Sequence, residues 1–253
     1  MLDPVEGAAI AAVFDVSDEQ VRRDHLISHL LAALATHVPD AVVFFGGTAL
    51  ARTHLPDGRL SEDIDLYAQP NRLAVVDEIE TTLETGILRE YGRLTWSPPL
   101  SAVKDTLPAI LRTSDGLTVR VQLLDPAHHP DWPTERRGLH QRYSDAPAAT
   151  LTVLTLPAFA ASKTTAWNDR HAPRDLYDLW GLAALGAIDR EAASLFARHG
   201  PTGHPPRAWM FRDAPTIDDW RRQLSSQTRI AVDPADALTV VREAWDGAVG
   251  GIP

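Results

Sequence analysis

The sequence contains no cysteine, and only two of its 24 basic residues, Lys104 and Lys163, are lysines. The absence of cysteine excludes disulfides, zinc–thiolate sites, iron–sulfur clusters and cysteine nucleophiles. The formal net charge is -10, so no overall positive field attracts nucleic acid, and any such contact needs a local basic patch. Long apolar runs are also missing, because the stretches 26–34 and 41–45 are too short to span a bilayer. The first residues carry no basic segment of a secretory signal, so we expect a cytoplasmic protein without membrane contact.

The length and the overall composition are typical of a soluble globular protein. The chain has 253 residues, of which 44% are hydrophobic and 23% charged, enough for one large domain or two small ones. The pattern changes near residue 150. We predict an α/β (α+β) half with a mixed sheet over 1–150 and an all-helical half over 151–253.

Local patterns predict the elements of both halves. Ser17 and Gln20 form a capping box at the start of a helix that ends at Pro39. The predicted strands are 41–45, 62–67, 109–112 and 117–123, the last two forming a hairpin, and the predicted helices are 48–55, 75–83, 158–168, 173–185 and two within 207–247. The stretch 126–147, rich in proline, histidine and arginine, is expected to form long loops.

The chemistry is concentrated in Phe45–Leu50, with sequence FGGTAL, and in Arg59–Leu66, with sequence RLSEDIDL. Gly46 and Gly47 end a strand and open a helix at Thr48, an arrangement that lets backbone N–H groups approach a phosphate. Asp63 and Asp65 alternate with apolar residues on the next strand, so both carboxylates point from one face. Two adjacent carboxylates repel one another, and a divalent cation such as Mg²⁺ relieves that repulsion. Ser61 precedes them and can donate its hydroxyl to a phosphate oxygen.

These two segments resemble the first motif of the AbiEii/AbiGii toxins, nucleotidyltransferase-like toxins similar to the mycobacterial MenT proteins and to the DNA polymerase β-like superfamily. A second matching region, Leu156–Trp180, carries a lysine on one helix and an Arg-Asp-x-x-Asp-Leu stretch on the next. The resemblance implies a nucleotidyltransferase-like fold for the half 1–150. It implies Asp63, Asp65, Lys163 and Asp178 as catalytic residues, with Mg²⁺ on Asp63 and Asp65. It implies nucleotide binding by Gly46, Gly47, Thr48, Arg59, Ser61, Arg170, Arg174 and Asp175. It also implies an NTP substrate, release of pyrophosphate, a tRNA or other RNA acceptor and a cognate antitoxin protein.

One departure from the superfamily pattern concerns its third carboxylate. The register places Gln122 where that carboxylate is expected, and Asp125 lies an odd number of residues away, on the other face of the strand. Gln122 is neutral and cannot act as a base. Three interpretations remain open: Asp178 supplies the missing carboxylate, one metal ion suffices, or the enzyme is impaired.

Other polar groups carry weaker signals. His25 and His29 are one helical turn apart, but no acid or third histidine accompanies them at ligand spacing, so they are interpreted as structural. His128 and His129 lie in a proline-rich stretch and are expected to be exposed. The segment 135–142 is a local basic cluster that can contact a phosphate backbone or remain a solvated loop. Arg174 and Asp178, four residues apart, are also compatible with a simple surface ion pair.

Three functions follow. The first is a toxin that moves a nucleotide from an NTP to RNA, at the tRNA 3′ end by analogy with the MenT group, and so blocks translation. The second is a small-molecule nucleotidyltransferase like those that modify aminoglycosides, for which an acidic protein suits a cationic acceptor. The third is a catalytically inactive nucleotide-binding module, an interpretation favoured by Gln122.

Overall fold

The computed structural model describes residues 2–250 and divides the chain into two compact units. The first unit contains the chain up to His129 together with Thr134–Val153, and the second contains Pro130–Pro133 and the chain from Leu154 onward. Residues 1 and 251–253, the outermost residues of the two predicted domains, lie outside the described part. The α/β character of the first half, its mixed sheet and the helices of the second half are confirmed. One strand of the sheet, Thr150–Leu154, extends past the predicted boundary at residue 150.

The first unit is built on a seven-stranded mixed sheet with strand order β3-β4-β5-β2-β1-β7-β6. Its strands are β1 (Val42–Phe45), β2 (Asp63–Ala68), β3 (Thr95–Trp96), β4 (Ala109–Arg112), β5 (Thr118–Leu124), β6 (Thr134–Gly138) and β7 (Thr150–Leu154). Its helices are α1 (Pro4–Phe14), α2 (Asp18–His37), α3 (Gly46–Thr53), α4 (Arg72–Thr85) and α5 (Leu88–Tyr91), with short 3-10 turns η1 (Leu100–Ala102) and η2 (Pro126–His128).

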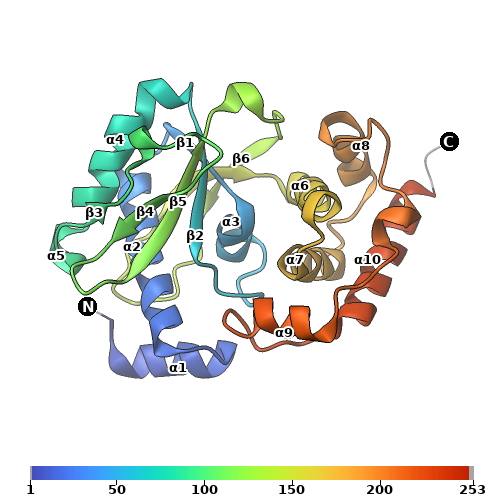
Figure 1. The fold of residues 1–253 in the computed structure, drawn as a ribbon, viewed down its shortest axis with the longest axis horizontal. Helices are drawn as coiled ribbons and strands as arrows, with labels where there is room; N and C mark the ends of the chain where they lie inside the picture. The colour runs from blue at the N-terminus through green and yellow to red at the C-terminus, as the bar shows by residue number, and fades with distance from the viewer. Residues whose placement is uncertain (1, 251–253) are drawn as a thin grey trace. The chain divides into compact units, whose positions relative to one another are not determined.

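Strand pairing at the centre of this sheet positions the polar motif. β1 and β2 are antiparallel and are joined by α3, while β2 runs parallel to β5 on its other side. α2 and α4 pack beside one another, and Figure 1 shows α3 on the other side of β2 from α4. The predicted hairpin is confirmed as the antiparallel pair β4–β5. The polar motif therefore lies on the central strand β2 and on the helix that leads into it.

The segment that follows β5 differs from expectation. The stretch expected to form long loops contains β6, a polar strand at the edge of the sheet, and η2. Because an edge strand with no buried face has no alternation of apolar residues, its sequence carries no strand signal.

The helix predicted from the Ser17 capping box is confirmed as α2, with the Ser17 hydroxyl accepting a bond from the backbone N–H of Gln20 at 3.3 Å.

The second unit consists of helices packed around α7. Its elements are α6 (Leu156–Arg170), α7 (Pro173–Ala184), α8 (Arg190–His199), η3 (Ala208–Phe211), α9 (Ile217–Leu224) and α10 (Pro234–Val249). α6, α9 and α10 all contact α7. Trp167, Trp220 and Trp245 are almost completely buried in this core, and the indole N–H of Trp167 donates to the carbonyl of Met210 at 2.8 Å.

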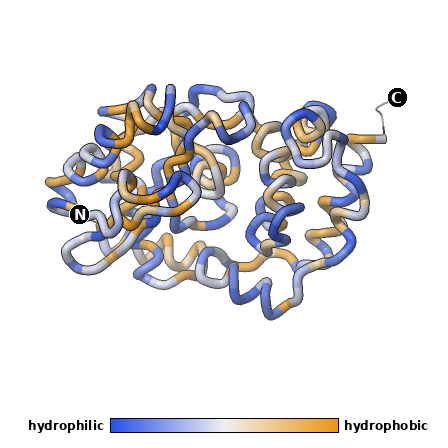
Figure 2. The backbone as a smooth tube through the Cα atoms, turned by 45° about the horizontal axis from the view of Figure 1, so that its top comes forward, coloured by the Kyte–Doolittle hydropathy of each residue, from blue (hydrophilic) through white to orange (hydrophobic). Residues whose placement is uncertain are grey.

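Hydrophobic and hydrophilic segments alternate along the backbone of both units (Figure 2). Within residues 2–250, no helix combines the length and the apolar character that crossing a membrane requires.

Candidate active site

β2 presents two carboxylates on one face, as its alternating sequence predicts. Ile64 and Leu66 are completely buried, whereas Asp63 and Asp65 are half-buried on the opposite face. The buried pair fixes the rotation of the strand, because a one-residue slip would expose both apolar side chains. The carboxylates are therefore held in place by the core beneath them.

Gly46 and Gly47 are required by the protein's own side chains. Gly46 has a φ of +79°, and a Cβ added there would lie 2.3 Å from Oδ2 of Asp65. A Cβ added at Gly47 would lie 2.3 Å from Nη2 of Arg59. The double glycine thus allows the Asp65 carboxylate and the Arg59 guanidinium to lie directly against the first turn of α3, where backbone N–H groups lack helical partners.

Arg120 and Gln122 lie beside the two aspartates on the neighbouring strand. In the parallel register, Asp63 is opposite Arg120 and Asp65 is opposite Gln122. Arg120 makes a two-pronged contact with Asp63, with Nε to Oδ1 at 2.7 Å and Nη2 to Oδ2 at 3.0 Å. The amide of Gln122 donates to the carbonyl of Asp105 at 3.2 Å. Gln122 thus occupies the position expected from the sequence, while Arg120 is a site residue that the sequence analysis missed.

The contact between Arg120 and Asp63 changes the charge of the site. Hydrogen bonding to Asp63 raises the pKa of Arg120 above its usual value. Both carboxylate oxygens of Asp63 face this cation. A metal ion on Asp63 would therefore replace at least part of the Arg120 contact. The two carboxylates still provide the hard oxygen donors that Mg²⁺ prefers, so the residues present fit such an ion.

The remaining first-unit residues of the predicted site support the backbone. The Thr48 hydroxyl donates to the carbonyl of Asp63, which ties the first turn of α3 to the start of β2. Ser61 is buried, and its carbonyl accepts a bond from the side chain of Gln20 at 3.5 Å. Arg59 is buried as well. Asp125 lies beyond the end of β5, where it accepts bonds from the backbone N–H groups of Ala127 and Arg72.

In the second unit, α6 and α7 bury a lysine between two carboxylates. Nζ of Lys163 lies 2.6 Å from Oδ2 of Asp178 and 3.3 Å from Oδ1 of Asp175. The side chains of all three residues are less than a tenth exposed. Asp175 and Asp178 are three residues apart on one face of α7, so both reach the same partner on α6.

Arg170 completes this cluster from the end of α6. Its Nε donates to Oδ2 of Asp175 at 2.7 Å and its Nη2 to Oδ1 at 3.0 Å. Burial opposes ionisation of Asp175, but the charges of Lys163 and Arg170 outweigh this effect and hold the pKa of Asp175 below its usual value. Asp175 is therefore ionised at neutral pH. Arg174 is half-buried beside it on α7.

Comparison with known proteins places this chain in a family. The family model described as "Nucleotidyl transferase AbiEii toxin, Type IV TA system" matches residues 29–249. The chain belongs to the AbiEii family. This AbiEii protein is therefore a nucleotidyltransferase and a toxin of a type IV toxin–antitoxin system, which implies an antitoxin partner.

Solved structures show the same fold for this AbiEii protein. MenT4, a nucleotidyltransferase toxin from Mycobacterium tuberculosis H37Rv, matches with a TM-score of 0.73 at 21% identity, covering 100% of this chain and 91% of MenT4. A protein from H. pylori described as a putative nucleotidyltransferase matches with a TM-score of 0.55 at 15% identity, covering 91% of this chain and 95% of that one. No curated protein sequence matches the AbiEii chain.

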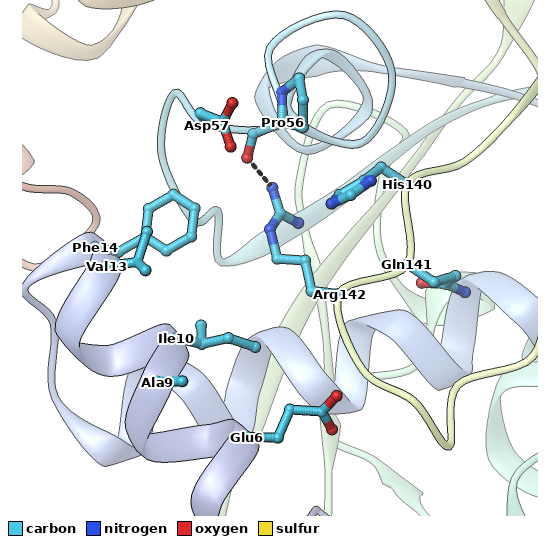
Figure 3. Close-up of a pocket in the computed structure, with 10 residues that line it drawn as sticks. All are labelled: Glu6, Ala9, Ile10, Val13, Phe14, Pro56, Asp57, His140, Gln141 and Arg142. Carbon is cyan, nitrogen blue, oxygen red and sulfur yellow. Dashed lines mark hydrogen bonds between the residues drawn. The ribbon is translucent and has the colours of Figure 1, made fainter.

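A pocket of about 290 Å³ in the AbiEii protein lies at a different place, between α1 and the segments 56–57 and 140–142 (Figure 3). Arg142 crosses it, and its Nη2 donates to the carbonyls of Pro56 at 2.8 Å and Ala51 at 2.9 Å. The Arg142 side chain is thus buried, so Arg142 belongs neither to a solvated loop nor to an exposed basic cluster over 135–142. Asp63 and Asp65 do not line this pocket.

A buried ion pair next to this pocket was also missed from the sequence. Nη2 of Arg52 on α3 lies 2.7 Å from Oδ1 of Asp24 on α2, and both side chains are 1% exposed. Tyr143 donates its hydroxyl to Asp24 at 3.1 Å. Burial lowers the pKa of Arg52 to about 10, which leaves it charged at neutral pH. The network fixes α3 to α2, and no local spacing signal could reveal it, because the partners are far apart in the sequence.

Proposed function

We propose that this AbiEii toxin transfers a nucleotide from an NTP to the 3′ end of tRNA in the cytoplasm, with Mg²⁺ dependence, and thereby blocks translation. The observation that carries the proposal is the pair of carboxylates, Asp63 and Asp65, held on one strand face against the double glycine of α3. Family membership supports the transfer reaction. The RNA acceptor rests on likeness to the MenT toxins.

The proposed reaction is an in-line displacement at the α-phosphorus. An RNA hydroxyl oxygen bonds to that phosphorus while its bond to the pyrophosphate oxygen breaks, and pyrophosphate leaves. Because Gln122 cannot accept a proton and Arg120 is cationic, the hydroxyl proton passes to water in this proposal. Mg²⁺, bound by Asp63 and Asp65, would supply charge neutralisation for the triphosphate.

The chain's own residues position and neutralise the NTP in this proposal. Gly46, Gly47 and Thr48 offer the N–H groups at the start of α3 to the phosphates, with Ser61 beside them. Arg59 and Arg120 add positive charge to the triphosphate end. We assign Lys163, Asp178, Asp175, Arg170 and Arg174 to the same reaction because they lie in the region that resembles the second family motif, and Lys163 acts there as a compact phosphate-binding cation.

The test incubates the purified toxin with each labelled NTP, Mg²⁺ and total tRNA, and measures both label transfer and pyrophosphate release. We expect labelled tRNA with the wild type and a loss of at least about 100-fold with Asp63→Asn and Asp65→Asn, since both substitutions keep the side-chain shape and remove charge. Asp77→Asn, an exposed aspartate on α4, is the matched control and retains activity.

Each other outcome points to a different function. Transfer to a cationic small molecule such as an aminoglycoside, with none to any RNA, would support the small-molecule enzyme and exclude the tRNA proposal. Nucleotide binding with no pyrophosphate release from any NTP would support the inactive module, for which Gln122 opposite Asp65 is the structural argument. Growth arrest that persists with Asp63→Asn would show that toxicity does not come from nucleotide transfer.

A further inference from the structure

Two histidines on α2 and an aspartate from a distant loop converge in the first unit. His25 and His29 lie one turn apart and are almost completely buried, with side chains 1% and 2% exposed. Asp145, in the segment between β6 and β7, is 120 residues away from His25 in the sequence. Its side chain is 30% exposed, so the cluster reaches solvent on the Asp145 side. Asp145 is therefore the acid that the sequence around His25 and His29 does not contain at ligand spacing.

The three facing atoms form a compact triangle. Nε2 of His25 lies 3.0 Å from Oδ1 of Asp145 and 3.3 Å from Nε2 of His29, and Nε2 of His29 lies 3.6 Å from the same oxygen. A tetrahedral zinc ion about 2.0–2.1 Å from nitrogen and oxygen ligands separates those ligands by roughly 3.3–3.4 Å. The triangle therefore has the size of one face of a tetrahedral site.

Nε2 of each histidine faces the same carboxylate oxygen, Oδ1 of Asp145. Nδ1 of His25 faces the hydroxyl of Tyr91. If Nδ1–H donates to the Tyr91 oxygen, the lone pair of Nε2 points at His29 and Asp145. Outer-shell partners of this kind orient the histidines of metal sites.

We propose that His25, His29 and Asp145 bind one zinc-type divalent cation, with water in the fourth position. Imidazole nitrogens favour zinc, cobalt or nickel over magnesium, so the chemistry of this site differs from that of Asp63 and Asp65. The same three ligands also satisfy one another as a metal-free polar network. The two interpretations differ in a measurable property, which is the affinity for the metal.

Bound metal would attach the Asp145 segment to α2. That segment also carries Tyr143, whose hydroxyl bonds to Asp24 next to His25, and Asp24 pairs with Arg52 of α3. An ion at this point therefore strengthens the contacts that hold α2, α3 and the loop together. Because it binds the folded state only, it stabilises the protein in proportion to the logarithm of its concentration.

The experiment uses the full chain without a histidine tag, freed of metal by dialysis against chelator. Zn²⁺ is titrated in competition with a chromophoric chelator, and Co²⁺ is added to a second sample to record its visible spectrum. We expect one tight equivalent of Zn²⁺, a rise in Tm with Zn²⁺ but not with Mg²⁺, and the intense visible bands of tetrahedral Co²⁺.

Substitutions test whether Zn²⁺ binds to His25, His29 and Asp145. His29→Gln and Asp145→Asn each remove a ligand and should weaken Zn²⁺ binding by more than the roughly tenfold to 100-fold that loss of an outer-shell partner costs. His37→Gln, an exposed histidine on the same helix, is the matched control and should bind as the wild type does. Asp63→Asn should also keep full Zn²⁺ affinity, which separates this site from the transfer reaction.

Asp145→Asn keeps the size of a partly exposed side chain, so it tests the proposal even if His29→Gln fails to fold. Circular dichroism in metal-free buffer confirms that each variant is folded. A wild type that binds no Zn²⁺ more tightly than its surface histidines do would overturn the proposal. So would Zn²⁺ binding that is unchanged in Asp145→Asn and His29→Gln.

Discussion

At the residue scale, Gly46 is the position where backbone conformation and site chemistry coincide. Its φ of +79° is unfavourable for any residue with a Cβ, and the added Cβ would lie 2.3 Å from the Asp65 carboxylate. The left-handed conformation alone costs about 1–2 kcal/mol for a non-glycine residue. We therefore expect Gly46→Ala to lose that stability and, by displacing Asp65, on the order of 100-fold in nucleotide transfer.

Gly116 provides the matched control for this prediction. Its φ is +91°, but nothing lies within 4 Å of an added Cβ. Gly116→Ala should therefore lose similar stability in urea unfolding while keeping its transfer rate. Equal loss of activity in both variants would mean that the effect comes from stability rather than from the position of Asp65.

Residue patterns in the sequence predicted some of this site and missed other parts. The alternation around Ile64 and the double glycine are local signals, and both are present in the structure as expected. Arg120 was missed because its contact with Asp63 depends on which strand pairs with β2, and in which register. At the separate cluster on α2, Asp145 was missed because only the folded chain brings it to His25.

At the scale of elements, α6 and α7 form a pair around a buried charge. Lys163 on α6 lies between Asp178 and Asp175 of α7. Removing one partner from a buried charge cluster costs about 3–5 kcal/mol, because the remaining charges lose their compensation. We expect Lys163→Met to destabilise the protein by this amount at neutral pH. Lys104→Met, at the exposed second lysine of the chain, is the matched control.

The pH dependence of stability tests whether the loss in Lys163→Met comes from charge. In the wild type, the lowered pKa of Asp175 contributes stability at and above its usual titration range, and that stability is lost as the pH falls through the lowered value. In Lys163→Met, the buried Asp175 faces less positive charge, so its pKa rises and its protonation at low pH costs the variant less stability than it costs the wild type. The Tm difference between wild type and variant should therefore narrow from pH 7 to about pH 4.5. A constant difference would show that the loss is one of packing alone.

Element prediction succeeded where a buried face or a cap produces a local pattern. α2, with its Ser17 cap, and the hairpin β4–β5 follow directly from such signals. β6 lies at the edge of the sheet with a polar sequence, and so its formation depends on its neighbour β7. The change of periodicity near residue 150 predicted that helices follow the α/β part, but it did not reveal that β7 extends to Leu154.

At the scale of the whole molecule, a net charge of -10 must be reconciled with an RNA substrate. The edge strand β6 carries two arginines, Arg136 and Arg137, whose side chains are 49% and 41% exposed. Each contacts one carboxylate, Asp40 for Arg136 and Glu135 for Arg137. Such exposed pairs are weak, so a phosphate backbone can compete for both cations.

If β6 contacts the proposed tRNA acceptor, replacing both arginines removes two phosphate contacts. The logarithm of kcat/KM for tRNA falls linearly with the logarithm of salt concentration, by roughly 0.7–0.9 per contact. The double variant Arg136→Ser/Arg137→Ser should therefore flatten this slope by about 1.5, raise KM at low salt and leave kcat unchanged. Arg221→Ser/Arg222→Ser on α9 is the matched pair elsewhere on the chain and should leave the slope as it is. An unchanged slope in the β6 variant would mean that the RNA contacts lie elsewhere, since two exposed cations cannot leave a phosphate interface without reducing its salt dependence.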